Sequence, residues 1–174
     1  MKALLGMLIA AVIFASAGTA AAEEITPEQA DRIVSQMKNP FVPVASLEEA
    51  EEQSGYKIER LKAVPEYYTA KPEVSVVKGG EMIQIAYQEP MDEKRMLYRA
   101  SKKLSSQVMN GDYSDYERDT EKRIGSYRIR IKGSEDVIYA AEWTSDGVNY
   151  CLLVDDGLDD VELEEMLTGR SASE

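Results

Sequence analysis

The chain contains no histidine among its 174 residues. This absence excludes Ser-His-Asp and Cys-His catalysis, and it removes the commonest general base and the commonest zinc ligand. G-x-G-x-x-G and Walker-type phosphate loops are also missing. We therefore expect a protein that is not an enzyme and that uses no cofactor. Because paired carboxylates can hydrolyse glycosides, a carboxylate-dependent hydrolase is the enzymatic alternative.

Cysteine is nearly absent as well, since Cys151 is the single one. One thiol cannot close an internal disulfide, so the fold must depend on its core. Cys151 lies in the apolar run Tyr150-Cys151-Leu152-Leu153-Val154. This run predicts a buried, reduced thiol in a central strand, with intermolecular pairing as the alternative.

Basic residues are outnumbered, because the chain has 20 lysines and arginines against 32 aspartates and glutamates. Its net charge is therefore −12. An acidic surface repels phosphate backbones and anionic lipid headgroups. We therefore expect no nucleic-acid partner and no attachment to a membrane surface. The charge itself is typical of a surface that maintains solubility.

The long apolar run of the sequence lies at its beginning. Lys2 precedes apolar residues 3–17, and the small residues Thr19-Ala20-Ala21-Ala22 follow before Glu23. This order predicts a secretory signal peptide over residues 1–22. The run is short for a membrane span of about 20 residues, so we expect cleavage and no stable membrane insertion, with a retained anchor as the alternative. The residue directly after the cleavage site is Glu23 and not a cysteine, so the protein is expected to be exported to the envelope or outside, soluble and not a lipoprotein.

Capping signals predict three helices. Thr26-Pro27-Glu28-Gln29 begins a helix within residues 23–38, which ends at Asn39-Pro40. Ser46-Leu47-Glu48-Glu49 begins a short surface helix that Gly55 closes. Asp159 and Glu162 form a capping box for a last helix ending at Gly169, and residues 170–174 are expected to be a flexible tail.

Alternating apolar residues and turn residues predict a sheet between these helices. The expected strands are 74–78, 81–88, 94–101, 116–124, 127–132, 137–143 and 148–154, whereas 41–45 is read as an extended connection. Because hairpins link most of them, we expect one α+β domain over residues 39–169. Its antiparallel, curved sheet has about six or seven strands, and the N- and C-terminal helices pack on one face.

The hairpin at Gly125-Ser126 can be predicted residue by residue. A two-residue turn places Ile124 opposite Tyr127, Lys122 opposite Ile129, Glu121 opposite Arg130, and Asp119 opposite Lys132. Arg128, Arg130 and Lys132 then share one face. Acidic residues opposite this basic row favour a solvated, paired face over an anion site.

Two acidic segments were considered as calcium sites. Residues 110–121 place Asn110, Asp112, Ser114 and Glu121 at EF-hand ligand positions, but Asp115 replaces the required glycine. Residues 155–160 are better explained by a turn and a helix cap. We therefore expect no metal at either segment.

Tyrosine dominates the aromatic residues, with ten tyrosines against two phenylalanines and one tryptophan. Most lie in strand-like segments and are expected to pack in the sheet. Tyr113 and Tyr116 instead lie in the polar connection Gly111-Asp112-Tyr113-Ser114-Asp115-Tyr116. Asp112, Tyr113, Asp115 and Tyr116 are the candidate partner-contact residues, and a solvated turn is the alternative.

Several short motifs together resemble a known family. These are Asn39-Pro40-Phe41-Val42-Pro43-Val44, Ser46 to Ala50, Gly111-Asp112-Tyr113, Ala141-Glu142-Trp143 and Gly157-Leu158. They are similar to the DUF4367 domain, a domain of unknown function in exported and envelope proteins of mainly Gram-positive bacteria. The resemblance covers about residues 39–167 and implies no catalytic residues.

These observations predict an exported, non-enzymatic domain of the cell envelope. We expect it to bind an envelope protein or a small ligand through its surface. A carrier that holds an apolar ligand in a cavity between sheet and helices is a second non-enzymatic possibility.

Overall fold

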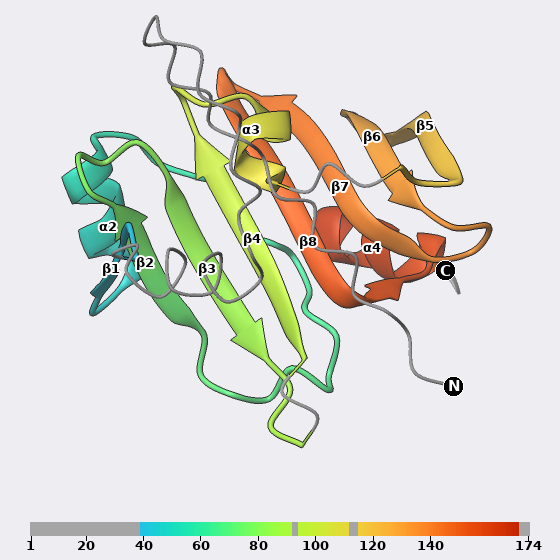
Figure 1. Ribbon diagram of the computed structural model, residues 1–174, viewed down its shortest axis with the longest axis horizontal. Helices are drawn as coiled ribbons and strands as arrows, with labels where there is room; N and C mark the ends of the chain where they lie inside the picture. The colour runs from blue at the N-terminus through green and yellow to red at the C-terminus, as the bar shows by residue number, and fades with distance from the viewer. Residues whose placement is uncertain (1–38, 92–93, 112–114, 171–174) are drawn as a thin grey trace, which may run out of the picture. The chain divides into compact units, whose positions relative to one another are not determined.

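The computed structural model describes residues 39–91, 94–111 and 115–170 (Figure 1). These residues form one antiparallel sheet of eight strands and three helices. The elements are β1 (Phe41–Val44), α2 (Leu47–Ser54), β2 (Glu73–Val77), β3 (Ile83–Gln88), β4 (Arg95–Ser101), α3 (Ser106–Asn110), β5 (Arg118–Ile124), β6 (Tyr127–Gly133), β7 (Ile138–Ser145), β8 (Val148–Leu158) and α4 (Asp160–Thr168). The expected α+β fold with an antiparallel sheet is confirmed, although the strand count of six or seven is too low.

The strands run in the order β1-β2-β3-β4-β8-β7-β6-β5. Two meanders of consecutive strands therefore meet where β4 pairs with β8, in the middle of the sheet. The connection from β4 to β5 must pass from this centre to the far edge. It carries α3 on its way, which places that helix over one face of the sheet (Figure 1).

The strand that the sequence did not predict is β1, which contains Pro43 and falls in the segment 41–45 expected to be an extended connection. Phe41 pairs with Val77 and Val44 with Val74, so the segment is the edge strand next to β2. An edge strand has one unpaired side, and proline is tolerated there because its missing N–H breaks no ladder bond. The prediction of a connection was therefore wrong at this segment.

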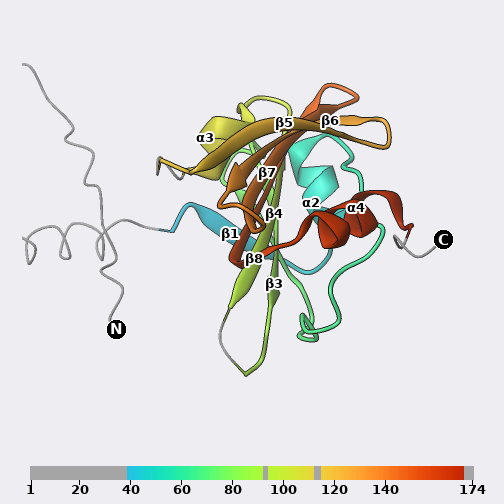
Figure 2. The same cartoon turned by 90° about the vertical axis from the view of Figure 1, so that its right-hand side faces the viewer.

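One face of the sheet, which we call the inner face, carries the main core. Alternate residues of the strands point to it, including Ile83, Met96, Tyr98, Tyr150 and Leu152, all essentially buried. The helices α2 and α4 cover this face, and Leu47 and Ala50 of α2 are buried in the same cluster as Leu163, Met166 and Leu167 of α4. Figure 2 shows both helices on the same side of the sheet.

The other face, the outer face, carries α3 (Figure 2). Met109 of α3 packs with Cys151 and Met82 in a second, smaller apolar cluster. No sequence pattern predicted α3. The N- and C-terminal helices were expected on one face of the sheet, and of these two the structure describes α4, which lies on the inner face together with α2. The N-terminal helix predicted within residues 23–38 lies outside the described residues, as do the predicted signal peptide 1–22 and tail residues 171–174.

The capping predictions are confirmed where the structure describes them. The Ser46 side chain accepts from the Glu49 N–H at 3.2 Å, and Gly55 ends α2 with a φ of 74°. Asp159 and Glu162 form the reciprocal capping box of α4, and Gly169 ends that helix with a φ of 71°. Glu49 differs in one detail, because its carboxylate accepts from the Ala45 N–H rather than from Ser46.

The hairpin register at Gly125-Ser126 is also confirmed over the whole of β5 and β6. The side-chain pairing differs from the expected direct pairs. Arg130 binds Asp119 at 2.7 Å and Arg128 binds Glu121, both diagonally across the strands. Lys132 is buried and turns instead to Glu142 on β7, so the basic row is not wholly solvated.

Cys151 lies on β8, at the centre of the sheet, and its side chain is fully buried as a free thiol. Burial raises the pKa of this thiol to about 12, and the nearby Glu142 carboxylate adds to the shift. The prediction of a buried thiol in a central strand is therefore confirmed. Within the described ranges, no helix is long and apolar enough to cross a membrane.

Candidate functional site

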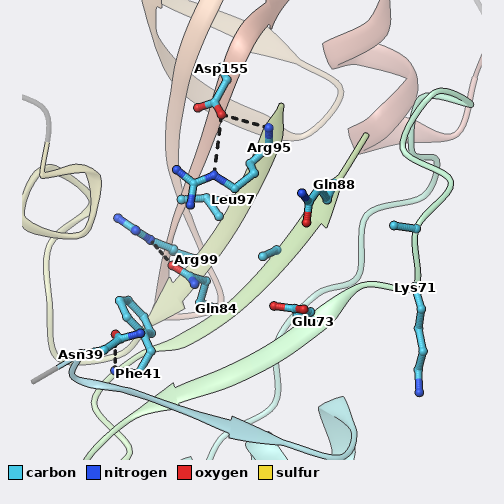
Figure 3. A pocket seen from close by; sticks show the side chains of 12 residues that line it. Asn39, Phe41, Lys71, Glu73, Gln84, Gln88, Arg95, Leu97, Arg99 and Asp155 are labelled. Carbon is cyan, nitrogen blue, oxygen red and sulfur yellow. Dashed lines mark hydrogen bonds and ion pairs between the residues drawn. The ribbon is translucent and has the colours of Figure 1, made fainter. Parts of the chain in front are cut away.

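The outer face of the first meander is hollowed. Side chains that alternate with the inner core point into this space, so Gln84 and Ala86 come from β3 and Leu97 and Arg99 from β4. We call this space the outer hollow, and its volume is about 810 Å³. Its lining residues are Asn39, Phe41, Ala70, Lys71, Glu73, Gln84, Ala86, Gln88, Arg95, Leu97, Arg99 and Asp155 (Figure 3).

A second hollow of about 600 Å³ adjoins the first towards β1. The two hollows form one continuous depression over β1 to β4, because they share the lining residues Asn39, Phe41, Lys71, Glu73, Gln84 and Ala86. Each volume falls within the range of about 300–1,000 Å³ typical of ligand pockets.

Arg99 is the most constrained polar residue of the outer hollow. Its Nε donates to Gln84 Oε1 at 2.8 Å, and its Nη1 donates to the Met109 carbonyl at 2.5 Å and the Asn110 carbonyl at 3.4 Å. The guanidinium carbon also lies 5.6 Å from the centre of the Phe41 ring. The side chain is therefore held in one position, and it links β4 to the C-terminal end of α3.

Burial lowers the pKa of Arg99, and the positive charge of Arg95 lowers it further. The Cys151 thiol acts in the opposite direction. An arginine has an ordinary pKa above 12, so Arg99 stays charged in spite of this. The hollow therefore holds a fixed positive charge at its floor.

The rim nearest β8 is closed by an ion pair. The Asp155 carboxylate accepts from the Arg95 main-chain N–H at 2.9 Å, and the Arg95 Nε lies 3.8 Å from the same carboxylate (Figure 3). Across the hollow from Arg99, Lys71 and Glu73 are exposed. The hollow is thus amphipathic, with charged edges around the apolar side chains of Leu97, Ala86 and Phe41.

A buried polar network fixes α3 beside the hollow. Lys132 Nζ lies 2.8 Å from Glu142 Oε1, and the two side chains are only 8% and 4% exposed. Asn110 Nδ2 donates to the same carboxylate at 2.8 Å, and Ser106 Oγ donates to it at 3.3 Å. Both residues belong to α3, so the helix is held by Glu142 as well as by Arg99.

The inner face is filled by aromatic rings. The rings of Tyr98, Trp143 and Tyr150 stack on one another with centroids 5.4–6.1 Å apart. Glu59 binds the hydroxyls of two of these rings, because its carbonyl accepts from Tyr98 and its main-chain N–H donates to Tyr150. Its carboxylate accepts from the neighbouring Tyr127. These side chains occupy the space in which an apolar ligand carrier would need its cavity.

The structure describes two of the four residues that the sequence predicts for partner contact. Asp112 and Tyr113 lie outside the described residues. Asp115 is exposed, whereas Tyr116 is partly buried and its ring stacks on Tyr139 with centroids 6.5 Å apart. The role of these four residues in partner contact stays a prediction.

The acidic segments considered for calcium have other partners. Asp155 binds Arg95 and Asp156 binds Lys94, while Asp159 caps α4 and Asp160 binds Arg118. Asp112 and Ser114 of the other segment lie outside the described residues. In residues 39–91, 94–111 and 115–170, no group of three or more acidic or cysteine side chains is placed to hold a metal ion.

No sequence pattern predicted the outer hollow. In 94–101, Arg95 and Arg99 alternate with Met96, Tyr98 and Ala100, and two arginines on the outward side of one strand were the available signal. The partners of Arg99 come from β1, β3 and α3, and no local pattern brings these elements together.

No family model, no curated protein and no solved structure matches this chain. The resemblance to DUF4367 therefore stays a prediction.

Proposed function

We propose that the protein is a non-catalytic binding module of the cell envelope whose ligand lies in the outer hollow. The observation that carries this proposal is the hollow itself, about 810 Å³ in volume and lined by fixed polar and apolar side chains. Such a combination is typical of ligand sites. The envelope location rests on the predicted signal peptide of residues 1–22.

Fewer observations support the two alternative functions, an apolar-ligand carrier and a carboxylate-dependent hydrolase. An apolar carrier needs a cavity between sheet and helices, but Tyr98, Trp143 and Tyr150 pack there and are at most 4% exposed. A carboxylate hydrolase needs two carboxylates in a cleft, one of them buried so that its pKa is raised. The two carboxylates that line the outer hollow, Glu73 and Asp155, are both exposed. Among the described residues Glu142 is the one buried carboxylate, and it is bound to Lys132.

Site-specific photocrosslinking tests the proposal. Gln88, in the lining of the hollow, is replaced by p-benzoylphenylalanine, and the matched control carries the same group at Ser126, in the exposed β5–β6 turn. After irradiation in the envelope fraction, we expect mass spectrometry to show a defined adduct at position 88 that is absent at position 126. Equal labelling at both positions, or none at position 88, would contradict a ligand site in the hollow.

The connection containing Asp115 and Tyr116 is a second candidate, for a protein partner, because Asp115 is exposed beside a fixed aromatic ring. Pull-down from envelope extracts with Tyr113→Ala plus Tyr116→Ala tests it. Since Tyr116→Ala also removes the stack on Tyr139, Asp115→Ala serves as a variant that leaves the stack in place. Unchanged recovery with both variants would exclude this connection as the contact.

A further inference from the structure

Among the residues that the structure describes, no carboxylate balances the partly buried positive charge of Arg99. Five cationic side chains of the described residues are partly or fully buried, namely Lys94, Arg99, Arg118, Lys122 and Lys132. Four of them bind a carboxylate: Lys94 binds Asp156, Arg118 and Lys122 bind Asp160, and Lys132 binds Glu142. Within the described part of the chain, the partners of Arg99 are the amide of Gln84, two main-chain carbonyls and the Phe41 ring.

An unbalanced charge is costly when it is withdrawn from water, and proteins usually pair such charges. Neutral acceptors satisfy hydrogen bonds but supply no opposite charge. A guanidinium has five N–H groups, of which Nε and Nη1 are used here. Nη2 has no hydrogen-bond partner within the described ranges. Arg99 therefore has both donors and charge available for an anion.

The charge of the lining limits the kind of anion. Lys71, Arg95 and Arg99 are positive and Glu73 and Asp155 are negative, which leaves one net positive charge. One charge matches a single carboxylate better than a phosphate dianion. The neighbouring surfaces of Leu97, Ala86 and Phe41 are apolar and suit an aliphatic or aromatic body.

We propose that the outer hollow binds an organic monocarboxylate, with its anionic group against Arg99 and its apolar part on Leu97, Ala86 and Phe41. This inference rests on the proposed function, because it names the ligand class of the same site. The carboxylate takes the place that a protein carboxylate takes beside the other four cations. Figure 3 shows Arg99 bound to Gln84, with Leu97 on one side of it and Phe41 on the other.

The test uses acids and their amides as probes. Hexanoate and 3-phenylpropionate, with hexanamide and 3-phenylpropionamide as neutral controls, are titrated to about 10 mM into the ¹⁵N-labelled protein and followed by NMR. We expect the acids to shift the Arg99 Nε–H signal and the amides of β3 and β4 saturably. The neutral controls are expected to bind at least about tenfold more weakly, because they lack the charge-assisted hydrogen bond.

Two variants locate the charge that is responsible. Arg99→Gln should weaken acid binding at least about tenfold, whereas Arg123→Gln, an equal change of charge on the exposed β5 edge, should leave it unchanged. Because Arg99 also holds α3, Leu97→Glu and Leu97→Gln form a second pair that leaves α3 untouched. Leu97→Glu should weaken acid binding far more than Leu97→Gln, through repulsion at close range.

The possible failures are distinguishable. Equal binding of acids and neutral controls, or no saturable shift with either acid, would overturn the carboxylate inference. If the hollow binds a neutral ligand, the crosslink at position 88 would still be obtained. The proposed function would then stand without the carboxylate inference. Equal effects of Arg99→Gln and Arg123→Gln would likewise overturn the assignment to Arg99.

Discussion

At the scale of single residues, the buried pair of Lys132 and Glu142 is the clearest source of specificity. Two charges withdrawn from water contribute little net stability when paired, but removal of one partner leaves the other uncompensated. Lys132→Met or Glu142→Gln alone should therefore lower the free energy of unfolding by about 3–5 kcal/mol. The double variant should cost clearly less than the sum of the single changes, as measured by urea unfolding.

The matched control for this pair lies on the same strand and the same face. Arg128 binds Glu121 at the protein surface, where the Arg128 side chain is 81% exposed. Arg128→Met should change stability by no more than about 1 kcal/mol. If Lys132→Met costs no more than Arg128→Met, the pair has no structural role.

Cys151 gives a second prediction at this scale. Its thiol is buried and its pKa is raised to about 12, so the reactive thiolate is scarce and inaccessible in the folded protein. We expect labelling by a thiol reagent at pH 8 only in denaturant. Ser126→Cys in a Cys151→Ala background is the control, because residue 126 is exposed and should be labelled at once. Rapid labelling of the native wild type would contradict the burial.

Residue-level properties were predictable where they depend on alternation alone. The burial of Cys151 and the outward direction of Arg99 follow from the pattern of their strands. Their partners do not, because Lys132 turns from its expected neighbour Asp119 to Glu142 of the next strand. Cross-strand order, which local sequence does not contain, decides such pairs.

At the scale of elements, Asp160 joins α4 to the edge strand β5. Burial alone raises the pKa of this carboxyl, but hydrogen bonds from Lys122 and Arg118 outweigh it and the net pKa is lowered. A carboxyl with a depressed folded pKa contributes stability above its unfolded pKa of about 3.9 and loses it as the pH falls through the folded value.

Asp160→Asn should therefore lower the free energy of unfolding by about 0.5–1 kcal/mol at pH 7, since the pair is partly exposed. The difference from wild type should shrink as the pH is lowered below about 4 and vanish once the carboxyl is protonated. Urea unfolding at pH 7, 5 and 3 measures this. A difference that is constant across these pH values would mean that charge is not the cause.

Elements with local signals were the predictable ones. The ends of α2 and α4 were predicted from the capping residues Ser46 and Asp159 and from the glycines that follow the helices. The turn residues Gly125-Ser126 predicted the register of the β5–β6 hairpin. The helix α3 was missed because five residues carry little helical pattern and contacts to Arg99 and Glu142 hold it. The outer hollow depends on the same tertiary contacts, and it was missed for the same reason.

At the scale of the whole molecule, the described residues form two meanders that share one core. β4 pairs with β8 although the two strands lie far apart in the sequence, so no hairpin turn predicts this pairing. The inner cluster nevertheless runs without interruption from Val76 of β2 to Ile129 of β6. The helix α2 lies against β1 to β3 and α4 lies against β5, so what the two halves share is the stack of Tyr98, Trp143 and Tyr150 at their junction.

This shared core predicts one cooperative unfolding transition. Trp143 fluorescence reports on β7, and hydrogen exchange of the β2 and β3 amides reports on the other meander; both should give the same free energy of unfolding. Tyr98→Leu, at the junction, removes stacking on Trp143 and Tyr150 and should lower both values together by about 2–4 kcal/mol. If the β2 and β3 amides exchange at a much lower free energy than Trp143 reports, the two meanders are separate units of stability.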